Sequence, residues 1–200
     1  MKTDVMSAGK KIIAIASSTG GPKALQEVIP LLPKDLKAPV LIVQHMPAGF
    51  TAALAERLDN LSAVKVREAR EGDVLEEGQV YLAKGGSHMK VVRQAGRHVI
   101  RYTDEPLREG VRPCANYMYE SLADSSFDEV ICVVMTGMGA DGTEGIKNLQ
   151  KRKQTTVISQ SEDTCIVYGM PRSVVQAGVS QEVVPLTKIA NEIIKNVGVV

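Results

Sequence analysis

The feature that most constrains the fold is a set of short runs that are rich in valine and isoleucine and end at small or polar residues. Some of them, such as "KIIAIAS" and "EVICVVMTG", are apolar at nearly every position. Near-continuous apolar runs of this length are typical of strands that are buried on both faces, as in a parallel sheet. The expected strands cover residues 11–17, 39–45, 63–69, 129–137 and 155–161.

Helical patterns separate these runs. Apolar residues recur at helical spacing within residues 22–32, 50–61, 142–152 and 185–197. The alternation of strands and helices predicts βαβ units. The middle of the chain differs, because residues 88–94 and 97–102 show the alternating pattern of an antiparallel hairpin around Ala95 and Gly96. We therefore expect one α/β domain over residues 11–200, a doubly wound, mostly parallel sheet flanked by helices, with an inserted hairpin.

Composition narrows the function classes. The chain has 200 residues, of which 44% are hydrophobic and 24% charged, and this is the composition of a globular domain. A net charge of +1 gives no overall field that would attract nucleic acid or an anionic membrane. The longest apolar runs are far shorter than the roughly 20 residues of a membrane span. We expect neither nucleic-acid binding nor membrane insertion.

The N-terminal residues and the cysteines indicate the cellular compartment in which we expect the domain. Residues 1–10, "MKTDVMSAGK", lack the apolar centre of a secretory signal and resemble the remnant of a linker. The three cysteines are odd in number and show no CxxC spacing. This pattern favours a reducing, cytoplasmic setting without structural disulfides. No metal or organic cofactor is signalled.

Three of the predicted strands end on residues that carry chemistry. The first ends at "SSTGG", which contains Ser18, the second ends at His45, and Asp141 lies just past the strand over residues 129–137. Ligands of open α/β sheets bind outside the carboxyl ends of the strands. A serine, a histidine and an aspartate at one sheet edge are the components of a nucleophile, a general base and the group that orients the base.

Each of these residues also has a structural interpretation. Ser18 or Thr19 fits the N-cap of the following helix. His45 fits a hydrogen-bonded histidine at a strand end. Asp141 followed by Glu144 resembles a capping box. The catalytic interpretation gains weight because the three polar residues fall at the same edge of the sheet.

The glycines after Ser18 favour an attacking hydroxyl. A tetrahedral oxyanion needs backbone N–H donors, each worth about 3–4 kcal/mol. The strand-to-helix turn exposes such groups, and Gly20 and Gly21 leave room for a substrate beside them. Phosphate binding is the alternative use of a glycine-rich turn. The sequence lacks GxxxxGK[ST] and GxGxxG, and His45 stands where a ribose-binding acid would follow the second strand.

Five separated motifs resemble one known family. "ASSTGGP", "QHMPAGFT", "YLAKGGSHM", "VVMTGMGADG" and "VYGMPRSV" occur in the order and approximate spacing of the catalytic domain of chemotaxis protein-glutamate methylesterases (CheB-type), over roughly residues 10–197. The resemblance implies hydrolysis of γ-glutamyl methyl esters on the cytoplasmic helices of chemoreceptors, with deamidation of glutamines as a related activity. It also implies a phospho-acceptor receiver domain ahead of this one in the full-length protein. A monomer suffices for this activity.

The resemblance also assigns roles by position. It implies that Ser18, and not Ser17, is the nucleophile. The other implied roles belong to His45 as the base, Asp141 as its orienter, and Met138 and, less directly, Thr19 as oxyanion N–H donors. The residues expected to line a substrate cleft are Gly20, Gly21, His88, Met170, Pro171 and Arg172.

A function without catalysis stays open at this point. The same α/β domain could bind receptor helices without catalysing a reaction. Labelling of Ser18 by a serine-directed ester probe, lost on His45→Ala, distinguishes an esterase from an adaptor.

Overall fold

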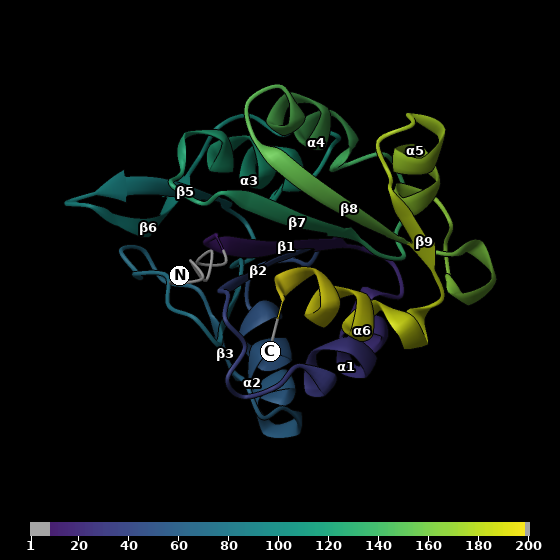
Figure 1. The fold of residues 1–200 in the computed structure, drawn as a ribbon, viewed down its shortest axis with the longest axis horizontal. Coiled ribbons are helices and arrows are strands. Elements are labelled where there is room, and N and C mark those ends of the chain that lie inside the picture. Colours follow the sequence, from purple (N-terminus) through teal and green to yellow (C-terminus); the bar gives the residue numbers. More distant parts are fainter. Residues whose placement is uncertain (1–8, 199–200) are drawn as a thin grey trace, which may run out of the picture.

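The computed structural model describes residues 9–198 and places one parallel sheet at the centre of the molecule (Figure 1). Within these residues the strand order of the sheet is β3-β4-β2-β1-β7-β8-β9, and every neighbouring pair is parallel. The strands are β1 (Lys11–Ser17), β2 (Val40–Gln44), β3 (Lys65–Glu68), β4 (Gln79–Leu82), β7 (Glu129–Val134), β8 (Gln154–Gln160) and β9 (Glu182–Val184). The expected doubly wound α/β fold is confirmed.

Helices cover both faces of the sheet, as Figure 1 shows. One face carries α1 (Gly21–Val28), α2 (Thr51–Leu61) and α6 (Leu186–Val197). The other carries α3 (Ala115–Ser121), α4 (Thr143–Gln150) and α5 (Met170–Gln176). Short 3₁₀ turns are η1 (Ile29–Leu31), η2 (Leu122–Asp124) and η3 (Glu162–Thr164).

The pleat of β1 divides the core into two layers. Ile13 and Ile15 pack with α1, α2 and α6, whereas Ile12, Ala14 and Ala16 pack with α3, α4 and α5. All five side chains are fully buried. Successive side chains of a strand point to opposite faces, so an apolar run without alternation fits this central position.

The predicted hairpin is present as β5 (His88–Gln94) and β6 (Arg97–Thr103), a separate antiparallel pair. Ala95 and Gly96 both have positive φ, as a two-residue hairpin turn requires. The hairpin projects beyond the sheet at the end where β1 begins (Figure 1).

Some boundaries differ from the sequence prediction. The structure adds β4 and β9, which are four and three residues long. The predicted strand over residues 129–137 ends at Val134, so the glycine-rich segment after it is loop. The linker predicted for residues 1–10 falls largely on residues 1–8, which lie outside the described residues. None of the helices within residues 9–198 has the length and apolar composition that a membrane span needs.

Candidate active site

The candidate site lies where β1, β2 and β7 end side by side. Ser17 and Gln44 form the last paired position between β1 and β2, so the next residues are Ser18 and His45. The His45 N–H donates to the Ser17 carbonyl at 3.1 Å. On the other side, the Ser18 N–H donates to the carbonyl of Thr136 after β7 at 2.9 Å. The central place of β1 therefore puts Ser18 between the other two strand ends.

Asp141 is a buried carboxylate with four hydrogen-bond donors, its side chain being 1% exposed. Its Oδ2 accepts from His45 Nε2 at 2.6 Å and from the Ala115 N–H at 2.7 Å. Its Oδ1 accepts from the Asn116 N–H at 2.9 Å and from Cys114 Sγ at 3.0 Å. Burial acts to raise the pKa of Asp141, but the hydrogen bonds from His45 and Ala115 outweigh it and lower the pKa. The carboxylate is thus held as an anion against the start of α3.

The capping box expected for Asp141 and Glu144 is not present. The N-cap of α4 is Gly142, which makes no side-chain cap. Instead, Asn116 Oδ1 accepts the N–H groups of Gly142 at 3.0 Å and Gly145 at 2.7 Å. Asp141, which precedes the N-cap of α4, therefore caps α3, and Asn116 of α3 caps α4. This exchange fixes Asp141 from both sides.

The His45 ring is oriented by Asp141. Because the ionised carboxylate only accepts hydrogen bonds, His45 Nε2 carries the proton and donates it to Oδ2. The neutral ring then has its lone pair on Nδ1. Among the described residues the Ser18 hydroxyl makes no hydrogen bond to this ring, and catalytic hydrogen bonds commonly close only when substrate binds. Nδ1 is therefore the nitrogen available to act as a base.

Only one of the two adjacent serines lies at the surface. Ser17 is fully buried, and its Oγ donates to Gln44 Oε1 at 2.6 Å. Ser18 is partly exposed and Thr19 is exposed. Neither caps α1, whose N-cap is Gly20 without a side-chain cap. The capping interpretation of Ser18 and Thr19 is wrong, and Ser18 is the hydroxyl that a substrate can reach.

The structure changes the interpretation of the two glycines. A Cβ at Gly21 would lie 1.9 Å from Gln44 Oε1 and 2.9 Å from Ser17 Oγ. A Cβ at Gly20, which has φ 81°, would lie 2.7 Å from Cβ of Ile166. The expectation that these glycines leave room for a substrate is not supported, because protein atoms fill that room.

The loops after β1 and β7 carry N–H groups without a partner near Ser18. A Cβ at Gly137 would lie 2.7 Å from Cβ of Ser18, so the two backbones are in contact. The N–H groups of Thr19 and Met138 donate to no partner among the described residues. Met138 itself is 70% exposed. Both N–H groups are therefore free to donate a hydrogen bond, and the oxyanion role that the resemblance implies for them stays a prediction.

One of the expected cleft residues, Met170, supports this loop together with Gly169. The N–H groups of Gly169 and Met170 donate to the Gly137 carbonyl at 3.1 and 2.8 Å. Met170 and Pro171 are buried, whereas Arg172 is exposed. Of these three expected cleft residues only Arg172 has an exposed side chain.

His88 is in the interior, contrary to its expected place in the cleft. It is fully buried, its Nδ1 accepts the Cys114 N–H at 3.1 Å, and Nε2 donates to the Pro106 carbonyl at 3.2 Å. Burial lowers the pKa of the His88 imidazole, which keeps the ring neutral. Because Cys114 is the N-cap of α3, His88 supports the helix end that binds Asp141.

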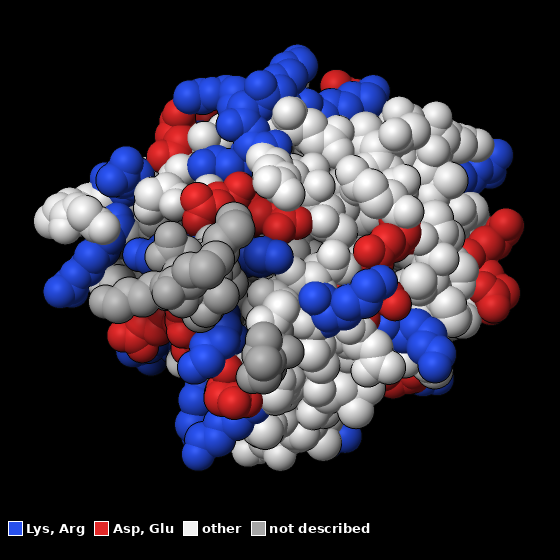
Figure 2. Space-filling view, viewed as in Figure 1, with Lys and Arg blue, Asp and Glu red and all other residues white. Residues whose placement is uncertain are grey.

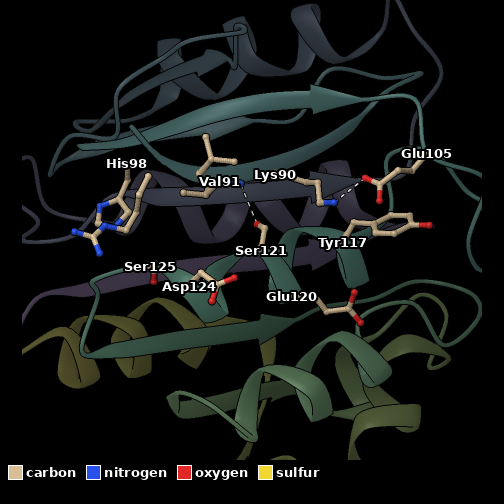
Figure 3. Close-up of a pocket in the computed structure, with 11 residues that line it drawn as sticks. Lys90, Val91, His98, Glu105, Tyr117, Glu120, Ser121, Asp124 and Ser125 are labelled. Atoms are coloured by element: carbon tan, nitrogen blue, oxygen red, sulfur yellow. Dashed lines mark hydrogen bonds and ion pairs between the residues drawn. The ribbon is translucent and has the colours of Figure 1, made fainter. Parts of the chain in front are cut away.

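The surface also has a groove that is separate from Ser18, His45 and Asp141. Its volume is about 480 Å³, and it runs between β5 and α3 (Figure 3). Lys90 and Glu105 form an ion pair at 2.7 Å on its wall, beside Tyr117. Ser18, His45 and Asp141 are not among its lining residues. Since the chemistry lies at the strand ends, the size of this groove does not locate the active site.

The charged side chains are unevenly spread. In the view of Figure 2 they gather toward the end that carries the hairpin, and a broad area over β8 and α5 has few of them. Two exposed apolar side chains occur near Ser18. Met138 follows Gly137 and Ile166 covers Gly20, and both are more than half exposed. Sequence patterns did not indicate a role for Ile166 or for Gln44, because their contacts form only in the folded chain.

Comparison with known proteins gives a consistent result. The family model described as CheB methylesterase matches residues 13–193. A protein-glutamate methylesterase/protein-glutamine glutaminase of Geobacillus kaustophilus is 47% identical over 94% of this chain and 54% of its own length. The protein of the same name from Bacillus subtilis is 45% identical over 92% of this chain and 52% of its own length. The chain thus spans about half the length of these curated relatives.

A solved structure shares the fold throughout. The crystal structure of the Thermotoga maritima CheB methylesterase catalytic domain is similar with a TM-score of 0.90 and 40% sequence identity. The match covers 94% of this chain and 98% of that one.

The contact between Gly21 and Gln44 predicts a coupled effect on stability. Gly21→Ala should lower the free energy of unfolding by about 1–3 kcal/mol, because the added methyl group overpacks a filled site. In a Gln44→Ala background the obstructing amide is gone, so the same change should cost clearly less. Urea unfolding of the four proteins measures the coupling. Equal costs in both backgrounds would contradict the assigned contact.

The environment of Asp141 predicts a pH-dependent contribution to stability. Its pKa is lower in the folded than in the unfolded chain, so its contribution is complete above about pH 4 and is lost as pH falls through the folded value. At pH 7, Asp141→Asn should lower the free energy of unfolding by about 2–3 kcal/mol, because charged hydrogen bonds are lost.

The difference between wild type and Asp141→Asn should shrink as pH falls below about 4 in urea titrations. Asp35→Asn is the control, because Asp35 is exposed and should show little effect. A difference that stays constant with pH would show that the Asp141 carboxylate is not held as an anion.

Proposed function

Because this chain belongs to the CheB methylesterase family, we propose that it hydrolyses glutamate γ-methyl esters of chemoreceptors and deamidates receptor glutamines, through an acyl-enzyme on Ser18. The observation that carries the proposal is the 2.6 Å hydrogen bond between His45 and the buried Asp141 carboxylate at the strand end next to Ser18. A histidine oriented in this way has its other nitrogen free to take a proton from a neighbouring hydroxyl.

The first half of the reaction forms the acyl-enzyme. Ser18 Oγ attacks the ester carbonyl carbon while His45 Nδ1 accepts the hydroxyl proton. Asp141 stabilises the resulting imidazolium through Nε2, and the N–H groups of Met138 and Thr19 stabilise the oxyanion. The tetrahedral intermediate then expels methoxide, which takes the proton from His45 and leaves as methanol.

The second half regenerates the enzyme. Water gives a proton to His45 Nδ1 and attacks the acyl carbon, and the glutamate leaves as Ser18 recovers its proton. With a glutamine substrate the first leaving group is ammonia instead of methanol. Each step uses groups of this chain and water.

The form of the site favours a protein substrate. Ser18 lies at the surface beside the exposed side chains of Met138 and Ile166, rather than within the groove near β5. Small-molecule sites usually bury most of their ligand in a concave pocket. A partly exposed nucleophile beside apolar side chains suits a helix that presents one ester side chain. Arg172 is a candidate for contact with an acidic receptor helix.

Another part of the proposal rests on the family resemblance. It is the receiver domain as a partner in the full-length protein. The cytoplasmic location rests instead on the cysteine pattern, and the monomeric state on the sufficiency of one chain for the activity. The alternative function is a receptor-binding domain without catalysis, and it predicts that Ser18 resists an ester probe while receptor binding is retained.

Substitution of the two serines tests the proposal. Ser18→Ala should reduce methanol release from methylated receptor by about 10³-fold or more, because it removes the nucleophile. Ser17→Ala removes a hydroxyl that only faces Gln44, so the loss should stay below about tenfold. Circular dichroism checks that both variants fold. If Ser18→Ala keeps the wild-type rate, Ser18 is not the nucleophile.

A further inference from the structure

We propose that Gln44 is a positioning residue that fixes the distance between the nucleophile residue Ser18 and the base residue His45. The inference rests on the proposed function. Gln44 is the last residue of β2 and is 2% exposed. Its Nε2 donates to the carbonyl of Ser18 at 2.9 Å and to the carbonyl of His45 at 3.3 Å. One amide group thus joins the two residues that must meet during catalysis.

The position explains why a link is needed there. The ladder between β1 and β2 ends at the pair Ser17 and Gln44, and both chains then leave the sheet. The last backbone hydrogen bond between the two chains runs from the His45 N–H to the Ser17 carbonyl, and none among the described residues joins Ser18 to His45. The Gln44 amide makes that link, because its two N–H groups donate to the Ser18 and His45 carbonyls on opposite sides of the strand gap.

The chemistry of the site selects glutamine. Nε2 must donate twice, and Oε1 must accept the Ser17 hydroxyl, which lies at 2.6 Å. Only a primary amide supplies two donors and an acceptor on one planar group. Asparagine has the same group on a shorter stem. Gly21 completes the site, because any side chain there would occupy the place of the amide.

Gln44 acts through other residues and does not touch the substrate. Its amide faces backbone carbonyls and a buried hydroxyl. Asp141 fixes the His45 ring, and Gln44 fixes the His45 backbone. A displacement of about 1 Å between reacting groups lowers rates by about 10²-fold. Loss of the link should therefore lower kcat and leave substrate binding almost unchanged.

The chain provides a control at the opposite ends of the strands, a partly buried glutamine whose amide donates in the same pattern. Gln79 is the first residue of β4, and its Nε2 donates to the carbonyls of Lys65 at 3.1 Å and Val80 at 3.3 Å. Its amide bonds to two carbonyls, one of them on the neighbouring strand, but the catalytic groups are at the other ends of the strands.

The test compares Gln44→Glu with Gln79→Glu. The introduced carboxylate has the shape of the amide but turns an oxygen toward carbonyl oxygens. For Gln44→Glu we expect kcat for methanol release to fall about 10- to 100-fold with KM within about threefold of wild type. For Gln79→Glu both constants should stay within about twofold. The ratio of kcat for Gln44→Glu to that for wild type should rise as pH falls, since a protonated carboxyl can donate one hydrogen bond.

A structural readout separates this inference from the proposed function. The ¹⁵N signals of the His45 ring should shift in Gln44→Glu and stay in place in Gln79→Glu. If wild type releases no methanol, the proposed function fails, and the ¹⁵N signals still decide the role of Gln44. If Gln44→Glu does not fold, Gln44→Met, which has similar length and no donor, should show the same loss of kcat. Wild-type kcat and unshifted signals in the Gln44 variants, or equal effects of both glutamate variants on kcat and melting temperature, would overturn the inference.

Discussion

The candidate site depends on the burial of the Asp141 carboxylate against the first turn of α3. A buried anion is costly unless donors surround it. Here α3 supplies the N–H groups of Ala115 and Asn116, and the histidine ring supplies a third donor. The loop after β7 must therefore bring Asp141 to α3, and Asn116 returns a cap to α4. Because each helix end is capped by a residue beside the other, the geometry of the candidate site and the packing of α3 against α4 cannot change independently.

Much of the fold could be predicted because hydrophobic patterning is a local signal. The unbroken apolar run of β1 has no polar face, which is possible only for a strand between two helical layers. The hairpin was predictable for the opposite reason, since β5 and β6 alternate around a two-residue turn. By contrast, β4 and β9 are too short to show a period. Their strand character comes from pairing with β2 and β8, which distant residues provide.

The candidate site was predictable in part. Polar residues that end buried strands stand out against apolar neighbours, and this drew attention to Ser18, His45 and Asp141. The pairing of His45 with Asp141 is observed in the structure, and the role of Ser18 as nucleophile stays a proposal. The supporting residues could not be assigned in the same way. The sequence places His88 in a cleft, whereas the structure buries it. Nothing in "GGSHMK" indicates that its ring will bond to Cys114, 26 residues away.

The glycines illustrate the same limit. A glycine in the sequence shows that a side chain is excluded but does not show which atoms exclude it. At Gly21 the excluding atoms belong to Gln44 and Ser17, and no sequence pattern connects these residues. The sequence suggested that the glycines of "STGG" leave room for a phosphate or for a substrate, and the structure supports neither for Gly21. The second glycine clears space for a buried amide.

The hydrogen bond to Asp141 sets the orientation of the His45 ring. β1 lies between β2 and β7, so His45 and the loop that carries Asp141 follow the strands on either side of the one that leads to Ser18. The nitrogen that bonds to Asp141 is Nε2, the one farther from the His45 backbone. The proposed mechanism leaves Nδ1, the nearer nitrogen, to Ser18. In chymotrypsin-type proteases the two nitrogens have the opposite roles. Either ring nitrogen can therefore serve as the base, and the position of the carboxylate in the fold decides which one is left for that role.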